Sequence, residues 1–434
     1  MIPLKSILYL FLLLASLFGS VVYHPLIGVL GYIFTYNINP LGHWWGTPFI
    51  DWGVRYSLFL ALATGLGIVF HRSKLKFNRL FESQEILLLI FLVIIWLSIP
   101  LGFGFNQEES NVVKMTKVVF ILLMASHVIT NLKHYQLMIW TLLIAGLYLG
   151  FETYKAPDWM FSGGRFHGGI GGSDFSEGNY LGAHFAMLLP IMGVMFLKGG
   201  WKSKTICLLS GVFVINGIIL CRSRGISMAV FVGIISAIIF SIPKYRLKLF
   251  FGLSIAIAGG VFLTDPGFWG RMKDIEETPS QIETSKIDSS IEGRILAWEV
   301  ALKMASDYPH GIGEGNFKKH VGEYNPGIAG KDTHNTLLRS LAELGIHGAF
   351  VLLLLISNAF WILYKLKNNV LQLVSKNNYL WHIYGLKIAL IIYLVAGMFI
   401  THTYIEEFYW LLMFPIFLKR AVENELNATK ISKK

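Results

Sequence analysis

Long apolar segments recur along almost the whole chain, and they restrict it to folds that cross a membrane. Of the 434 residues, 54% are hydrophobic and only 15% are charged. Eleven segments, most of about 17 to 20 residues, are long enough as helices rising ~1.5 Å per residue to cross a hydrocarbon core of ~30 Å. They cover residues 54–70, 84–101, 112–131, 135–154, 179–197, 204–221, 225–242, 247–264, 346–364, 383–400 and 404–418. The chain is therefore predicted to be an all-α polytopic membrane protein.

The first 36 residues form one more apolar region. The stretch from Ile7 to Tyr36 is too long for one straight span, and Pro25 and Gly28 interrupt it. A kinked helix and a span followed by a re-entrant piece both fit this pattern. The beginning of the region is similar to a secretory signal, but the many spans that follow favour an uncleaved signal anchor. One net crossing here gives about twelve transmembrane helices in total.

The basic residues predict the orientation, because loops rich in Lys and Arg stay on the cytoplasmic side. Such loops lie at 71–82, 198–204, 243–248 and 365–378, and the tail from Lys419 is also basic. The loops that alternate with them, 37–53, 102–111 and 401–403, contain no Lys or Arg. With twelve spans, both ends of the chain are expected in the cytoplasm and residues 265–345 outside. The net charge of +11 reflects this asymmetry and attraction to anionic membrane lipid, so we do not predict nucleic-acid binding.

Residues 265–345 are expected to form a large helical loop inserted into a single membrane domain that covers residues 1–434. Ser289 to Glu292 resembles a capping box, and the apolar residues after it recur at helical spacing until Pro309 and Gly311. The residues of that predicted apolar face are Ile291, Ile295, Trp298, Leu302 and Ala305. The segment 311–317, GIGEGNF, has the composition of a turn.

A second amphipathic helix is predicted to begin near His334, with Asp332 or Thr333 as its N-cap. Its apolar face would consist of Leu337, Leu338, Leu341 and Leu344. Two such helices beside a bilayer are expected to pack onto the membrane domain and to enclose a cavity.

Arginines also lie on the side where the charge rule does not expect them, among them Arg165, Arg222, Arg224 and Arg294. The planar guanidinium stays charged and binds phosphate through two parallel hydrogen bonds. Several of them at the outer leaflet predict binding of a pyrophosphate headgroup. The alternatives are that Arg222 and Arg224 only contact lipid phosphates, that Arg294 is a solvated helix position, and that Arg165 marks a mobile glycine-rich loop.

His334 is the candidate general base. A neutral imidazole can take a proton from a sugar hydroxyl, and the start of a helix disfavours the imidazolium form. Taken alone, a loop histidine beside Asn335 is more often a capping or surface residue.

Together these motifs resemble the bacterial O-antigen ligase and O-antigen polymerase superfamily. The similarity is carried by the SRG sequence at 223–225, by a GR-x3-W helix at 293–298 and by the segment HNTLLRSLAELG at 334–345. It is most specific over about residues 205–365.

The resemblance implies a lipid-linked-donor glycosyltransferase membrane fold in the bacterial inner membrane, with the active site facing the periplasm. It implies a metal-independent, inverting glycosyltransferase without a cofactor, whose donor is a glycan on a polyprenyl-pyrophosphate carrier. The acceptor would be a glycan, a lipid or a protein, which leaves ligase and polymerase both open. By motif position, His334 would deprotonate the acceptor, and Arg224 and Arg294, assisted by Arg222 and Arg165, would bind the pyrophosphate.

Two other classes of protein remain open. A secondary transporter or flippase for an anionic solute or a lipid-linked glycan fits the spans and the arginines, although the repeats and broken midplane helices typical of transporters are not evident. A structural scaffold of the cell envelope would tolerate replacement of His334 and Arg224.

Overall fold

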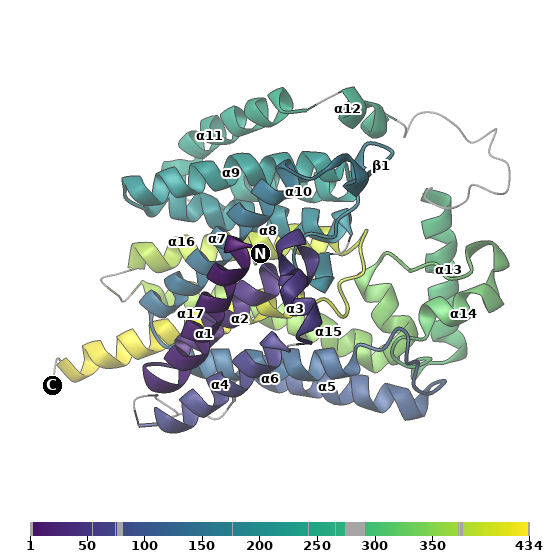
Figure 1. The fold of residues 1–434 in the computed structure, drawn as a ribbon, viewed down its shortest axis with the longest axis horizontal. Coiled ribbons are helices and arrows are strands. Elements are labelled where there is room, and N and C mark those ends of the chain that lie inside the picture. Colours follow the sequence, from purple (N-terminus) through teal and green to yellow (C-terminus); the bar gives the residue numbers. More distant parts are fainter. Residues whose placement is uncertain are drawn as a thin grey trace.

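The computed structural model describes residues 3–53, 55–73, 75, 81–175, 177–241, 243–264, 266–273, 291–371, 373 and 376–432. Nearly all regular structure in this part is helical (Figure 1). The helices are α1 (Leu4–Val22), α2 (Leu26–Asn37), α3 (Thr47–Asp51), α4 (Tyr56–Phe70), α5 (Ser83–Leu101), α6 (Val112–Val128), α7 (Leu132–Tyr154), α8 (Gly178–Lys198), α9 (Trp201–Cys221), α10 (Arg224–Phe240), α11 (Pro243–Phe262), α12 (Pro266–Lys273), α13 (Ile291–Asp307), α14 (Phe317–Tyr324), α15 (Thr336–Val370), α16 (Lys376–Ala396) and α17 (Glu406–Ser432). Strands β1 (Phe161–Ser162) and β2 (Arg165–Phe166) form a small antiparallel hairpin, and short 3-10 turns lie at 40–42, 44–46, 158–160, 173–175 and 326–328.

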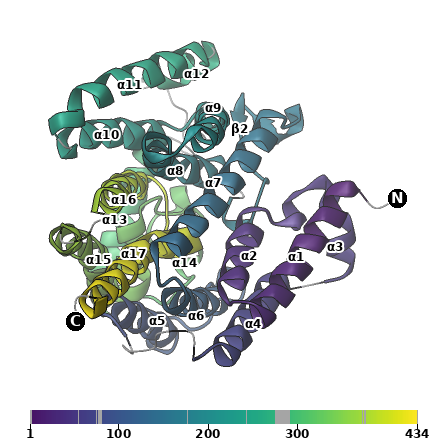
Figure 2. The same cartoon turned by 90° about the vertical axis from the view of Figure 1, so that its left-hand side faces the viewer.

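Each predicted span coincides with a helix, so the polytopic membrane class is confirmed. Eight helices of the described residues are long and apolar enough to cross a membrane: α1, α5, α7, α8, α9, α11, α15 and α16. The expected number of about twelve is not reached, because α4, α6 and α10 have 15 to 17 residues and α17 carries more charged residues than the others. Seen along the bundle, α1 to α3 lie at one edge and α9 to α12 at another (Figure 2).

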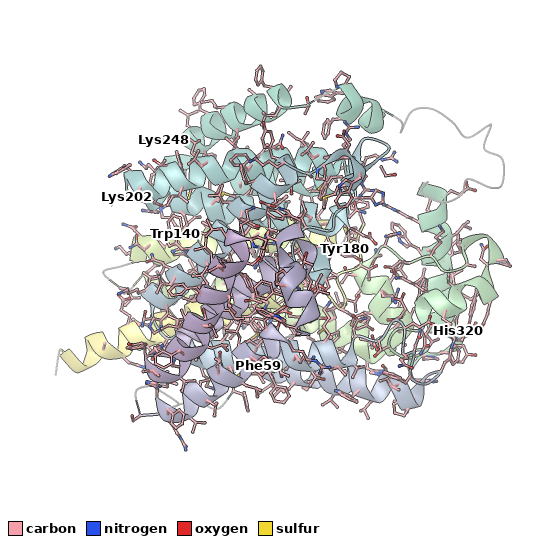
Figure 3. The ribbon with its side chains drawn as sticks, in the orientation of Figure 1. Phe59, Trp140, Tyr180, Lys202, Lys248 and His320 are labelled. Carbon is pink, nitrogen blue, oxygen red and sulfur yellow. The ribbon has the colours of Figure 1, made fainter. Side chains whose placement is uncertain are left out.

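The basic loops gather at one end of the bundle, and the insertion projects from the other. Figure 3 shows Lys202 and Lys248 at the end opposite to His320. We call these the basic end and the insertion end. The N-termini of α8, α10 and α15 and the turn at 397–405 all lie at the insertion end, as the alternation of the helices requires.

The first two helices form an antiparallel hairpin, which contradicts the expected single net crossing. The Lys5 ammonium lies 2.9 Å from a carboxylate oxygen of Glu152 at the end of α7. The His24 ring, in the turn after α1, lies 5.1 Å from the ring of His134 at the start of α7. The helix α2 then returns along α1. The beginning of α1 is therefore at the insertion end, whereas Asn424 of α17 binds the Thr130 carbonyl at the basic end, at 2.8 Å.

Small residues explain the hairpin. Pro25 is the N-cap of α2 and ends the preceding helix. A Cβ atom at Gly28 would lie 2.9 Å from the Cβ of Ser20, so only glycine allows α1 and α2 to approach this closely. The start of α1 and the end of α17 thus lie at opposite ends of the bundle rather than on one side.

The insertion has a small hydrophobic core of its own. The residues Ala297, Ala301, Met304, Ile312, Phe317, Val321 and Ala342 are fully buried in it. The apolar face predicted for α13 is confirmed only in part: Ala305 is buried, but Ile295 and Leu302 are 45% and 53% exposed. Ala297 and Ala301 belong to the buried face with it, and these alanines let α13 pack closely. The predicted capping box begins at Ser289, outside the described residues.

The helix α15 begins and bends differently from the prediction. Its N-cap is Asn335, not Asp332 or Thr333, and the Asn335 Oδ1 accepts hydrogen bonds from the N–H groups of Leu337 and Leu338, both at 3.0 Å. Gly345, with φ 72°, separates the first turns from the long apolar part. The predicted amphipathic helix and the following span are therefore two helical segments that share one element.

The buried face of these first turns is polar. Thr336, Arg339, Ser340 and Glu343 are buried, whereas Leu337 of the predicted apolar face is 38% exposed. The predicted leucine face is confirmed only in part: Leu344 is fully buried, but Arg339 and Glu343 take buried positions as well. They pair with each other and with neighbouring segments, which satisfies their charges inside the protein.

The glycine-rich turn at 311–317 clamps the insertion onto the bundle. The N–H of Phe103 donates to the Ile312 carbonyl at 2.8 Å, and the Asn106 amide donates to the Gly315 carbonyl at 2.8 Å. The Glu314 carboxylate accepts from the Asn111 N–H at 2.7 Å and from the Ser110 hydroxyl at 2.9 Å, where α6 begins. The predicted turn is confirmed, and its glycines 311, 313 and 315 all have positive φ.

Replacing Glu314 with glutamine should destabilise the protein by about 1–2 kcal/mol, because one oxygen acceptor at the buried start of α6 becomes an amide donor. Thermal unfolding of the purified protein in detergent measures the loss. Glu323→Gln is the matched control, because that side chain is 65% exposed. Equal melting temperatures for the two variants would contradict the assigned role of Glu314.

Candidate functional site

His334 occupies a strained backbone position at the insertion end. Its φ is 48°, and only Arg222, with φ 43°, shares a positive φ among the non-glycine residues of the described ranges. Such conformations cost of order 1–3 kcal/mol and persist where the surroundings enforce them. Here the Trp298 indole N–H donates to the Thr333 carbonyl at 2.9 Å on one side, and Asn335 caps α15 on the other.

The imidazole of His334 is half-buried, and its pKa is lowered. Burial is the largest cause, and the positive charges of Arg294 and Lys318 lower the pKa further, whereas Asp332 and Glu177 oppose them. The sequence predicts a neutral imidazole from the position of His334 at the start of a helix. In the structure, burial is the main reason. The ring is therefore mostly neutral near pH 7 and able to accept a proton.

Trp298 also places Arg294 close to His334. Arg294 precedes Trp298 by four residues, so both side chains lie on one face of α13. Because Trp298 is hydrogen-bonded to the residue before His334, this face of α13 is directed at the start of α15. The influence of Arg294 on the pKa of His334 agrees with this proximity.

Arg224 is the first residue of α10 and lies near the same turn as His334. A Cβ atom on the adjacent Gly225 would lie 2.7 Å from Phe399, and the Thr336 N–H at the start of α15 donates to the Gly397 carbonyl at 2.8 Å. The turn at 397–399 therefore lies between the starts of α10 and α15. Arg224 makes no hydrogen bond or ion pair with any residue that the structure describes. Its guanidinium is free to bind an anion.

Arg165 and Arg222 are engaged within the protein. The Arg165 Nε donates to the Cys221 carbonyl at 3.0 Å, and its Nη2 donates to Asn179. The Arg222 guanidinium packs over the backbone of the hairpin and of α12, and a Cβ atom at Gly267 would lie 2.6 Å from its Nη1. These two arginines connect the hairpin to α8, α9 and α12.

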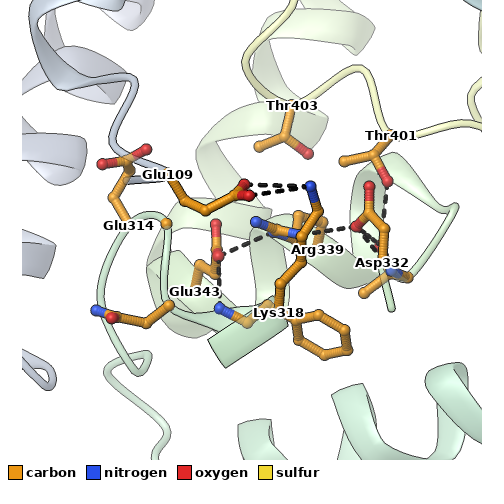
Figure 4. A network of polar contacts seen from close by, with 12 residues as sticks. Glu109, Glu314, Lys318, Asp332, Arg339, Glu343, Thr401 and Thr403 are labelled. Atoms are coloured by element: carbon orange, nitrogen blue, oxygen red, sulfur yellow. Dashed lines mark hydrogen bonds and ion pairs between the residues drawn. The ribbon is translucent and has the colours of Figure 1, made fainter. Parts of the chain in front are cut away.

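A second group of charged residues near His334 was not predicted from the sequence. Arg339 lies between Asp332 and Glu343, with its Nη1 2.7 Å from Asp332 Oδ1 and its Nε 2.9 Å from Glu343 Oε1 (Figure 4). The pair Arg339 and Glu343 has the i, i+4 spacing of helical ion pairs, which was the available signal. Asp332 lies before the helix, so no helical spacing indicated its part.

Residues 209–353 match the sequence model of a protein family described as O-antigen ligase. The match includes the SRG, GR-x3-W and HNTLLRSLAELG motifs, and it extends from α9 into α15. The resemblance noted from these motifs is thereby confirmed over this part of the chain. Among curated proteins, none matches the chain.

Proposed function

We propose that this membrane protein, in which residues 209–353 form an O-antigen ligase domain, transfers a glycan from a polyprenyl-pyrophosphate carrier to an acceptor hydroxyl. The reaction takes place at the insertion end of the bundle, on the periplasmic side of the bacterial inner membrane. The observation that carries this proposal is the strained, half-buried and mostly neutral His334 beside Arg294.

In the proposed reaction, the acceptor oxygen attacks the anomeric carbon of the donor sugar from the face opposite the pyrophosphate. The bond between this carbon and the pyrophosphate oxygen breaks, and its electron pair leaves with the polyprenyl pyrophosphate. His334 takes the proton of the acceptor hydroxyl. The configuration at the anomeric carbon is inverted, and no metal ion or other cofactor takes part.

Arg224 and Arg294 are proposed to bind the pyrophosphate and to stabilise the charge that develops on it. The start of α10 at Arg224 adds backbone N–H groups and the positive end of a helix dipole. Arg165 and Arg222 are assigned a structural part, because their guanidinium groups already have partners or close contacts within the protein.

The pH dependence of transfer follows from the lowered pKa of His334. The neutral form is the active base, so activity is lost as the pH falls through this pKa. The acid limb of kcat/KM should therefore have its midpoint below about 6.5, the ordinary value for histidine. A midpoint above this value would contradict His334 as a half-buried base. A pH series of initial rates measures it.

A reconstitution experiment tests the function. The donor is polyprenyl-pyrophosphate-linked glycan extracted from cells that lack the protein, and membranes of those cells supply the acceptors. We expect the purified protein to release polyprenyl pyrophosphate and to form a glycosylated product, both detected by mass spectrometry, with unchanged rate in EDTA. Movement of the donor across the membrane of proteoliposomes, without glycan transfer, would instead show that the protein is a transporter or flippase.

The identity of the product separates the possible acceptors. A glycan on lipid A core would indicate a ligase, a lengthened carrier-linked glycan a polymerase, and a glycan on a serine side chain a protein ligase.

A further inference from the structure

We propose that Arg339 is a positioning residue which, through Asp332 and Glu343, holds His334 in place for the reaction. This inference rests on the proposed function and assigns a part to a buried ion network that the transfer mechanism does not itself use.

Arg339 is almost fully buried, at 3% exposure, and lies in the first turns of α15. One side of its guanidinium faces Asp332, two residues before His334, and the other faces Glu343, one turn further along the helix (Figure 4). The guanidinium also lies over the ring of Phe317, 5.5 Å from the ring centre. A planar fork that binds two carboxylates fixes the distance between them.

The two carboxylates connect Arg339 to two other segments of the chain. Glu343 accepts from the Phe317 N–H at 2.8 Å and from the Tyr404 hydroxyl at 2.9 Å. Asp332 accepts from the Thr333 N–H at 2.7 Å and also bonds to the Thr401 side chain. The start of α14 and the turn before α17 are therefore tied to the residues that carry His334.

This network explains how His334 keeps a backbone conformation that costs free energy. The segment before it is fixed at Asp332, and the segment after it is fixed at Asn335 and Thr336. A left-handed residue between two fixed points cannot relax without breaking a buried ion pair, and an unpaired buried charge is strongly unfavourable. The network thus directs the imidazole toward the site.

Asp332 also sets the proton affinity of the base. The charged groups that act on His334 come from four segments: Asp332 beside it, Arg294 on α13, Lys318 on α14 and Glu177 before α8. The negative charge of Asp332 raises the pKa of His334, against the larger effect of burial. Burial alone would raise the pKa of Asp332 itself, but Arg339, His334 and Lys318 keep that pKa below its ordinary value. Asp332 is therefore ionised while it acts on the base.

Two variants test the inference in the full-length protein with the extracted donor. Arg339→Lys replaces a fork with a single ammonium, which cannot hold both carboxylates in the same geometry. Because a small displacement of a catalytic group costs about 10²-fold in rate, kcat should fall by about that factor with KM almost unchanged. Asp332→Asn keeps an oxygen acceptor for Arg339 but removes the charge, so the acid limb of kcat/KM should move to lower pH.

Arg420→Lys is the matched control. Arg420 binds both oxygens of the buried Glu85 at 2.8 Å, at the basic end of the bundle. Its variant should lose stability but keep the wild-type kcat and pH profile. Equal losses of kcat in Arg339→Lys and Arg420→Lys would overturn the inference, because the effect would then be one of general stability.

Unchanged kcat in Arg339→Lys, or an acid limb that stays in place in Asp332→Asn, would also overturn it. If Arg339→Lys does not fold, the pH profile of Asp332→Asn decides the question. Failure of the inference is distinguishable from failure of the proposed function, because His334→Asn tests the base directly. If His334→Asn loses transfer while Arg339→Lys and Asp332→Asn behave like the wild type, the positioning role of the network is wrong and the proposed function stands.

Discussion

Replacing His334 with asparagine should lower the rate of glycan transfer by about 10²- to 10⁴-fold, the usual contribution of a general base. Asparagine tolerates the left-handed backbone that His334 adopts, so the variant is expected to fold. It cannot accept the acceptor proton, whereas the proposed pyrophosphate site remains intact. Release of polyprenyl pyrophosphate from the extracted donor gives the rate, and the melting temperature gives the stability.

The matched control is His320→Asn on the same insertion. His320 lies on α14, and its ring contacts the exposed Glu323 carboxylate at 2.8 Å. Its replacement should leave the transfer rate unchanged. Transfer at the wild-type rate in His334→Asn would remove the imidazole from the mechanism, whatever the result for the control.

The helices could be predicted from the sequence because a membrane demands long uninterrupted apolar segments, and every predicted span lies on a helix. The direction of the first helix could not be predicted from the sequence. Whether Pro25 bends a helix or reverses it depends on what α2 packs against, and the close approach of Gly28 to Ser20 is a tertiary contact. Hydropathy carries no information about such a contact.

The faces of α13 and α15 were predicted only in part, for a related reason. The spacing of large apolar residues identifies the buried face of a helix only under two conditions. The surface that packs on the helix must be apolar, and it must leave enough room for large side chains. The segments that pack on α13 lie close to it, and alanines face them. In α15, Arg339 and Glu343 have charged partners inside the protein. Large apolar residues of both helices then lie at the exposed side, as Leu302 and Leu337 do.

Asp332, Arg339 and Glu343 lie close together in the sequence, but the other groups that bind this network could not be predicted because they come from distant segments. Glu343 accepts hydrogen bonds from Phe317, 26 residues away, and from Tyr404, 61 residues away. The same holds for polar contacts within the bundle, such as those of Lys114 with Asp174 and of His184 with Glu407. The motifs, in contrast, indicated His334 and Arg294 because GR-x3-W and HN are local patterns.

Arg224→Gln and Arg294→Gln should each lower kcat by about 10²- to 10³-fold. This is the loss typically seen when one hydrogen-bond donor to a developing negative charge is removed. Arg224 makes no ion pair with the described residues, so its replacement should leave the melting temperature almost unchanged. Arg294→Gln has a second expected effect. Because Arg294 lowers the pKa of His334, its loss should move the acid limb of kcat/KM to higher pH, opposite to the shift expected for Asp332→Asn.

Arg165→Gln is the matched control for both arginine variants. The Arg165 guanidinium binds the Cys221 carbonyl and the Asn179 side chain, so its loss should lower the melting temperature while the folded protein keeps most of its kcat. Rate measurements below the unfolding temperature separate the two effects. A loss of kcat in Arg165→Gln as large as in Arg224→Gln would place the pyrophosphate nearer to the hairpin. If both Arg224→Gln and Arg294→Gln transfer glycan at the wild-type rate, neither arginine binds the pyrophosphate, and the proposed pyrophosphate site is wrong.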